Sequence, residues 1–181
     1  MARWFWLFVF YSFGGYLLEK AFAFAVHAEQ QVRKCFLLWP LCPVYGLGMC
    51  AVLLLPAAVR TQGLRLFLCG GVTAAAAEYL THLFYEKAAG VFFWNYSCQP
   101  FQIRGRVCLP FTAVWGILVF LAVRFCQPVL EEAALSVPVP ATFAAMLSLT
   151  ADAVVSFSLL RRSHTVAYMS LPLLLRALRN R

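Results

Sequence analysis

The sequence predicts an all-α, polytopic membrane helix bundle with about five transmembrane helices. Three observations support this fold class: 63% of the 181 residues are hydrophobic, only 12% are charged, and the mean hydropathy is +0.78. A soluble domain has about 25% charged residues, whereas a bilayer-spanning helix needs roughly 20 mostly apolar residues in succession. We therefore expect one integral membrane domain over residues 1–165 and a basic C-terminal tail or interfacial helix over residues 166–181.

Five apolar runs account for the expected helices. The first extends from Trp4 to about Ala28, and we interpret it as a retained helix rather than a signal peptide because Glu19 and Lys20 interrupt its end. The second begins at a turn-forming Leu-Cys-Pro and covers residues 41–59. The other three cover residues 64–89, 107–125 and 141–160. Small residues before Glu78, including Gly70 and Ala74, predict close helix packing around that carboxylate.

The distribution of Lys and Arg predicts the orientation of the chain. With five spans the termini lie on opposite sides, and the side that holds the C-terminus carries ten of the fifteen cationic residues, against four on the other side and Lys20 inside the first span. Cytoplasmic loops are enriched in Lys and Arg. We expect a multi-pass protein of the inner cell membrane with its N-terminus outside and its C-terminus in the cytoplasm. The net charge of +8 then reflects topology and contact with membrane lipid, and we expect no nucleic-acid partner.

Four of the seven acidic residues, Glu19, Glu78, Glu86 and Asp152, fall within the apolar runs. An ionisable side chain at the bilayer centre costs roughly 2.5–3.5 kcal/mol on insertion scales, so such residues usually have a function or a partner. Glu78, His82 and Glu86 are spaced four residues apart and share one helix face. They are candidates for a substrate or proton path. The alternative is that Glu86 reaches the headgroups and Glu78 pairs with an arginine.

Two arginines are candidates to complete this site. Arg106, which with Arg104 flanks Gly105 before the fourth run, can pair with a carboxylate, bind a phosphate, or anchor the helix at the interface. Arg33 lies on the same expected cytoplasmic side. The sequence thus predicts a polar pocket formed by Glu19, Glu78, His82 and Glu86 and closed by Arg33 and Arg106. Aromatic residues such as Trp39 and Trp94 are typical of interfacial anchors. No local partner identifies the role of Asp152.

Several kinds of chemistry have no motif in this sequence. The seven cysteines form no C-x-x-C pair, so we expect neither zinc nor a disulfide framework, and no cofactor or other metal. There is no G-x-x-x-x-G-K-[ST], no H-E-x-x-H and no G-x-S-x-G. The chain therefore has no recognised catalytic motif and no ATP-binding P-loop, and energy for any transport must come from another subunit or an ion gradient.

A series of short blocks in a fixed order resembles the ABC-transporter type IV, or CmpB-like, permease family. The blocks occupy residues 10–19, 33–46, 78–79, 86–87, 94–97, 105–109 and 115–116, so the resemblance covers roughly residues 5–130. The family's motif residues match at Glu19, Arg33, Pro40, Cys42, Pro43, Tyr45, Gly46, Glu78, Tyr79, Glu86, Trp94, Tyr96, Ser97, Gly105 and Arg106. Three positions differ: Val32-Arg33-Lys34 stands for Asn-Arg-Gly, Trp39 precedes Pro40 in place of Gly, and Asn95 replaces an Asp.

The resemblance implies a small bacterial multi-pass membrane protein, typical of the Firmicutes, in a family whose transporter name is itself inferred. Our first hypothesis is a permease-like subunit that works with a separate ATPase and that functions as a homodimer if one copy is too small a translocation unit. A second is a membrane enzyme acting on a lipid or lipid-linked phosphate, with Arg106 holding the phosphate and Glu78 or His82 as base. A third is a non-catalytic assembly or regulatory membrane protein whose acids only form interhelical ion pairs.

Overall fold

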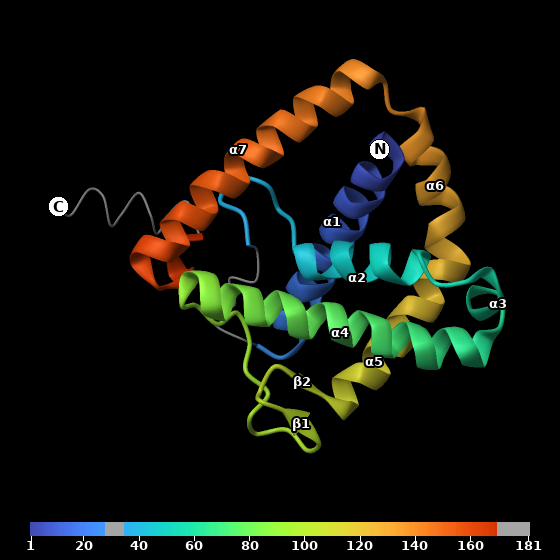
Figure 1. The fold of residues 1–181 in the computed structure, drawn as a ribbon, viewed down its shortest axis with the longest axis horizontal. Helices are drawn as coiled ribbons and strands as arrows, with labels where there is room; N and C mark the ends of the chain where they lie inside the picture. Colours follow the sequence, from blue (N-terminus) through green and yellow to red (C-terminus); the bar gives the residue numbers. More distant parts are fainter. Residues whose placement is uncertain (28–34, 170–181) are drawn as a thin grey trace.

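The computed structural model describes residues 1–27 and 35–169, and in these residues the regular secondary structure is helical apart from one short hairpin. Four helical segments are long and apolar enough to cross a membrane. They are α1 (Ala2–Ala25), α4 (Gly63–Ala89), the continuous segment Leu109–Ser136 and α7 (Val139–Ser163). In Figure 1, α2 lies between α1 and α4, while α7 runs diagonally from the end of α4 toward the N-terminal end of α1. The prediction of an all-α membrane helix bundle is confirmed.

The third of these segments is divided by a π-helical turn. It consists of α5 (Leu109–Leu121), the turn Ala122–Cys126 and α6 (Gln127–Ser136), with Pro128 in the first turn of α6. Inserting one residue into the helical hydrogen-bond ladder lets the axis change direction. In Figure 1 the segment bends here, so that α5 lies along α4 and α6 lies along α1.

The second apolar run differs from the expectation of a continuous helix over residues 41–59. Only Pro43–Leu53 form a helix, α2, and 11 residues extend about 16 Å, half the thickness of a bilayer core. The helix stops before Pro56, which disfavours helical geometry for its predecessor, and α3 (Ala57–Arg60) follows. The structure therefore has four helices of spanning length and one shorter apolar helix where about five spans were expected.

A non-helical segment, residues 35–42, leads into α2 beside the middle of α1. The Cys42 N–H donates to the Ser12 carbonyl at 3.0 Å, which places the start of α2 halfway along α1. On α7, the Asp152 carboxylate accepts the N–H groups of Leu37, Leu38 and Trp39 at 3.1, 3.0 and 2.7 Å. Backbone groups at membrane depth must be satisfied within the protein, so Asp152 is the acceptor that allows this segment to remain non-helical.

Small residues bring α4 close to its neighbours. A Cβ atom placed on Gly71 would lie 3.0 Å from the Gly116 Cα of α5, and one on Gly48 of α2 would contact Ala74. Glycine at such a contact lets two helix backbones approach. The close helix packing that was expected from the small residues before Glu78 is therefore present.

The ends of the long helices meet at two opposite ends of the molecule. Near the N-terminus, the Trp6 indole donates to Thr142 at the start of α7, at 2.9 Å. At the other end, His164 after α7 lies 3.0 Å from the Ala89 carbonyl of α4. A hairpin of β1 (Gln102–Ile103) and β2 (Val107–Cys108) lies near this second end (Figure 1). Of the expected tail, residues 166–169 form a 3₁₀ turn and residues 170–181 lie outside the described part.

Candidate functional site

Two of the intramembrane carboxylates line the same cavity. The cavity has a volume of about 340 Å³ and lies among the second half of α1, the segment that leads into α2, α4, α5 and the connection after α4. Its wall is largely aromatic and aliphatic, and its polar side chains include Glu19, Tyr45, Glu78, Tyr96 and the Trp115 indole. We call it the carboxylate cavity.

Glu78 is held at the cavity by donors from two other elements. Its side chain is only 5% exposed, and its two oxygens accept hydrogen bonds from the Tyr96 hydroxyl at 2.9 Å and from the Trp115 indole N–H at 3.0 Å. Glu78 follows a run of four alanines, whose small side chains leave room for these aromatic rings. Tyr96 and Trp115 therefore fix the position of the carboxylate, and both side chains also line the cavity.

Glu19 reaches the same cavity from α1. It accepts a hydrogen bond from the Tyr45 hydroxyl at 2.9 Å, and the Tyr45 ring packs against Trp115 with centroids 4.8 Å apart. Gly15 makes this possible, because a Cβ atom there would lie 2.2 Å from the Tyr45 ring. The two carboxylates are thus linked through one aromatic pair, Tyr45 and Trp115.

The start of α2 faces the carboxylate cavity. Cys42, Val44 and Tyr45 line its wall, and Pro43 occupies the first turn, where its missing N–H is not needed. A helix N-terminus carries a partial positive charge, so it favours carboxylates close to it. Of the motif residues that carry the family resemblance, Pro40 and Cys42 precede α2, and Pro43, Tyr45 and Gly46 lie in its first turn.

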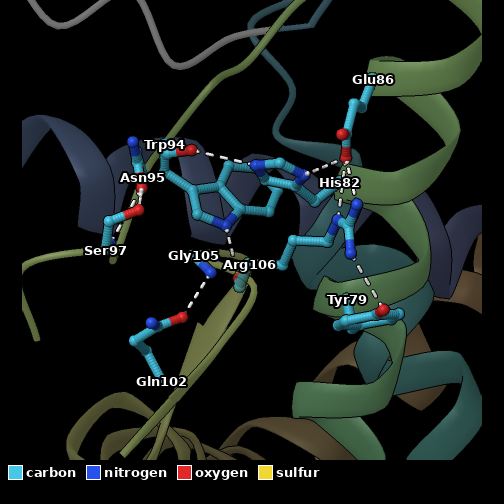
Figure 2. A network of polar contacts seen from close by, with 9 residues as sticks. All are labelled: Tyr79, His82, Glu86, Trp94, Asn95, Ser97, Gln102, Gly105 and Arg106. Carbon is cyan, nitrogen blue, oxygen red and sulfur yellow. Dashed lines mark hydrogen bonds and ion pairs between the residues drawn. The ribbon is translucent and has the colours of Figure 1, made fainter. Parts of the chain in front are cut away.

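Glu86 belongs to a different cluster, drawn in Figure 2. Its Oε2 atom accepts hydrogen bonds from Arg106 Nε at 2.8 Å and Nη2 at 2.6 Å. Arg106 Nη1 donates to the Tyr79 hydroxyl at 3.0 Å, and the guanidinium lies 5.1 Å from the Tyr79 ring centroid. The hydrogen bond from Glu86 raises the pKa of Arg106 above its usual value, so the guanidinium stays charged.

His82 completes this second cluster and is separated from the carboxylate cavity by Trp94. Its Nε2 atom lies 3.1 Å from the Trp94 carbonyl, and its Nδ1 atom lies 3.7 Å from Glu86 Oε2. The Trp94 indole in turn donates to the Arg106 carbonyl at 2.9 Å. The predicted stripe of Glu78, His82 and Glu86 therefore divides into two sites. Glu78 lines the carboxylate cavity, whereas His82 and Glu86 lie with Trp94 and Arg106 in the second cluster (Figure 2).

The connection after α4 is shaped to present Tyr96. The Tyr96 N–H donates to the Gly105 carbonyl at 2.8 Å, and Asn95 Oδ1 accepts from the N–H and hydroxyl of Ser97. Gly105 has φ +68°, and a Cβ atom there would lie 2.7 Å from Asn95 Oδ1. Glycine is required for both reasons. The sequence suggested an interfacial anchor here, whereas in the structure Tyr96 contacts Glu78.

The remaining predicted residues lie elsewhere. Asp152 is 4% exposed and supports the backbone of residues 37–39, away from the cavity. Arg33 lies outside the described residues, so its expected part in closing the pocket is not tested. Sequence reasoning missed the roles of Tyr45 and Trp115 as hydrogen-bond donors, although both lie in the blocks that carry the family resemblance. Within residues 1–27 and 35–169, no group of three or more His, Cys, Asp or Glu side chains is placed to hold a metal ion.

Comparison with known proteins gives a family match. A family model described as "Putative ABC-transporter type IV" matches residues 6–159, which is most of the chain. The match extends beyond the blocks that first indicated the resemblance and includes α7. Neither the curated proteins nor the solved structures include a significant match.

Proposed function

Because the chain belongs to the family described as "Putative ABC-transporter type IV", we propose that it is a permease-like membrane subunit in which Glu19 and Glu78 bind a cationic group of the substrate. The observation that carries the proposal is the carboxylate cavity, which places two carboxylates from separate helices against one space. A cationic group of a substrate in this space would face both carboxylates, whose oxygens accept hydrogen bonds.

The aromatic lining supports a protonated amine as the cationic group. Tyr45, Tyr96 and Trp115 surround the carboxylates, and aromatic faces attract ammonium groups, by about 2 kcal/mol or more when water is excluded. The carboxylates can accept hydrogen bonds from the same ammonium. A primary amine would thus contact both the carboxylates and the aromatic rings of the cavity.

The geometry supports this proposal better than action on a lipid phosphate. Arg106, which would hold the phosphate, is bonded to Glu86 and Tyr79 and does not line the carboxylate cavity. His82 is also outside the lining. The Glu86–Arg106 pair fits the structural ion pairs of an assembly or regulatory protein, but such a role gives no reason for a hollow space between Glu19 and Glu78.

The rest of the proposal concerns the assembly. The chain contains no P-loop, so a separate ATPase would supply the energy for transport. It would dock on the end of the molecule that holds the hairpin and the C-terminal ends of α4 and α7. We assign this end to the cytoplasm and the N-terminus to the outside, in the cell membrane of a bacterium, with residues 1–165 as one membrane domain.

Neutralising each carboxylate tests the proposal. We would purify Glu19→Gln and Glu78→Gln in lipid nanodiscs and measure the binding of radiolabelled butylamine by equilibrium filtration. Loss of an ion pair to the ligand should weaken binding by about tenfold or more, which corresponds to roughly 1.4 kcal/mol. Glu132→Gln is the matched control, because it removes the same charge from an exposed position on α6. Equal binding by wild type and both cavity variants would overturn the proposal.

A further inference from the structure

The hairpin between α4 and α5 carries an uninterrupted run of exposed side chains. Residues 97–104 are all exposed, whereas Val107 and Cys108 of β2 are buried. Within the run, Phe101 is 79% exposed and Ile103 is 58% exposed. The strand β2 therefore packs on the rest of the protein, and the strand β1 faces outward. We call residues 97–104 the hairpin face.

Two residues of the hairpin face have backbone conformations that are unusual for their side chains. Phe101 has φ +52° and Arg104 has φ +51°, a region in which glycine and asparagine are favoured and bulky residues are rare. Arg104 and Gly105 form a two-residue turn, in which the Arg106 N–H donates to the Ile103 carbonyl at 3.0 Å. Asn-Gly is the preferred sequence for a turn of this kind. Asparagine would thus suit both backbone positions better than the residues that occupy them.

Contacts inside the protein do not account for these two side chains. In residues 1–27 and 35–169, the Arg104 guanidinium forms no hydrogen bond or ion pair, and the Phe101 ring stacks on no other ring. Arg106, on the other side of the turn, is by contrast buried and paired with Glu86. Side chains that strain the backbone and gain no contact within the fold indicate a partner outside it.

The hairpin lies beside α4 and not beyond its end. Arg106, which directly precedes β2, contacts both Tyr79 and Glu86 of α4. At 1.5 Å per residue, these contacts are about 5–15 Å before the end of α4 at Ala89. Figure 1 shows the hairpin below α4 and short of that end. The hairpin face is therefore directed sideways from the last turns of a helix of spanning length.

At this level of the bundle, an outward face meets lipid. A helix of 27 residues extends about 40 Å, whereas the hydrocarbon core is about 30 Å thick, so the last turns of α4 reach the headgroup layer. In that layer, apolar side chains enter the boundary with the acyl chains and a guanidinium binds phosphate. A soluble partner would instead meet the ends of α4 and α7, which His164 joins beyond the hairpin.

The neighbouring helix ends make this level of the protein cationic. The exposed charged residues in the last turns of α4 and α7 are Lys87, Arg161 and Arg162. All three carry a positive charge. Each cationic side chain near a membrane surface increases the attraction for anionic lipid. Anionic phospholipid is therefore a better match for the hairpin face than neutral phospholipid.

From these observations we infer that the hairpin face binds anionic phospholipid. Phe101 and Ile103 lie at the boundary between headgroups and acyl chains, and Arg104 holds the headgroup phosphate. The binding surface shares no residue with the lining of the carboxylate cavity. The inference therefore does not depend on the proposed function, and the lipid is a partner of the protein and not its substrate.

A fluorescent dye on Cys98 would report contact between the hairpin face and lipid. Replacing the other exposed cysteines, Cys69 and Cys126, with alanine directs a maleimide-linked NBD dye to Cys98. We would reconstitute the labelled protein in phosphatidylcholine vesicles that contain either nitroxide-labelled phosphatidylglycerol or nitroxide-labelled phosphatidylcholine, with the nitroxide at the top of the acyl chain. We expect both lipids to quench the dye, and phosphatidylglycerol to quench it at the lower concentration.

Variants of the two strained residues test their separate roles. Arg104→Asn should lower the preference for phosphatidylglycerol by about fivefold, the attraction expected of one cationic residue, whereas Arg104→Lys should keep it. Phe101→Asn should lose most of the quenching by both lipids, whereas Phe101→Leu should retain it. Arg65→Asn is the matched control, because it removes a cation from an exposed position at the opposite end of α4.

The stability of the variants separates lipid binding from a role in folding. Because asparagine suits both backbone positions, Arg104→Asn and Phe101→Asn should melt at or above the wild-type temperature in lipid-free detergent. A lower melting temperature in either variant would show that the side chain serves the fold, and would overturn the inference. Equal preference for phosphatidylglycerol in wild type and Arg104→Asn would do the same. Quenching of the wild-type dye by aqueous iodide and by neither lipid would assign the hairpin face to water or to a soluble partner.

Discussion

Gly14 and Gly15 are adjacent in α1, yet their Cα atoms face different surroundings. A Cβ atom on Gly15 would lie 2.2–2.5 Å from ring and Cβ atoms of Tyr45, whereas one on Gly14 would meet nothing within 4 Å. The obstacle at Gly15 is the base of a side chain that is itself bonded to Glu19. Neither residue is in the left-handed region, so the difference between them comes from packing alone.

Alanine at these two positions should have opposite effects on stability. We expect Gly15→Ala to destabilise the fold by about 1–3 kcal/mol, because Tyr45 must move. Gly14→Ala should be neutral or stabilise by up to about 1 kcal/mol, since alanine is a better helix former. Thermal unfolding of the two variants in the same detergent tests this, and a Gly15→Ala protein as stable as Gly14→Ala would contradict it.

The Arg106–Glu86 ion pair should contribute to the stability of the connection after α4. Arg106 is 7% exposed and takes both Glu86 and Tyr79 as partners. Removing one member of a buried pair leaves the other charge poorly solvated. Replacing one member of the pair should therefore lower stability more than expected from its own contacts, and replacing the second member as well should add little further loss.

A double-mutant cycle measures that dependence. We expect Arg106→Met to lower the melting temperature, and the combination of Arg106→Met with Glu86→Gln to lower it by less than the sum of the two single changes. Arg104→Met is the matched control, because Arg104 is two residues away and exposed. Additive effects of the two single changes would show that the pair does not contribute to stability.

At the scale of elements, the second crossing was the least predictable part. Hydropathy over residues 41–59 correctly indicated an apolar segment with a helix in it, but hydropathy carries no information about helical continuity. Pro56 was an overlooked signal that the helix ends early. The acceptor that satisfies residues 37–39 is Asp152, more than a hundred residues away. Only tertiary structure could reveal this pairing.

The long helices and the places of Glu19 and Glu78 along them could be predicted, because length and apolar composition determine the helices. The division of Glu78 from His82 and Glu86 could not, since helical spacing places all three on one face. It depends on Trp94, which belongs to an irregular connection, and on the turn at Gly105 that directs Tyr96. Connections of this kind follow no periodic pattern.

Asp152→Ala should release the segment that precedes α2. The N–H groups of Leu38 and Trp39 would lose their acceptor, at about 1–3 kcal/mol for each buried group. We expect faster hydrogen exchange at residues 37–39 and a lower melting temperature. Thr150→Ala, at an exposed position on the same helix, should change neither. Unchanged exchange in Asp152→Ala would show that the segment is held by other contacts.

For the whole molecule, the proposed orientation follows from the distribution of Lys and Arg along the sequence. The Arg124 side chain donates to the Thr61 carbonyl near the N-terminal end, while the hairpin with Arg104 and Arg106 lies near the other end. The end with the hairpin belongs to the side that carries most of the Lys and Arg residues in the sequence. Our assignment of that end to the cytoplasm rests on this asymmetry.

Labelling of single cysteines tests the orientation. In a variant whose only cysteine is the exposed Cys98, we expect a membrane-impermeant maleimide to react in inverted vesicles and not in intact cells. A variant whose only cysteine is introduced by Thr61→Cys should show the reverse pattern, because that exposed position lies at the opposite end. Labelling of Cys98 from outside intact cells would reverse the assignment of both termini.

The bond between Trp39 and Asp152 also has a consequence for how the protein is made. The two residues are 113 positions apart, so at about 5–20 residues per second a ribosome needs on the order of ten seconds to reach the second after the first. During that interval the amide groups of residues 37–39 lack their acceptor, and the translocon or a membrane chaperone must shelter them from acyl chains. Insertion of this crossing is therefore completed only when the last spanning helix emerges.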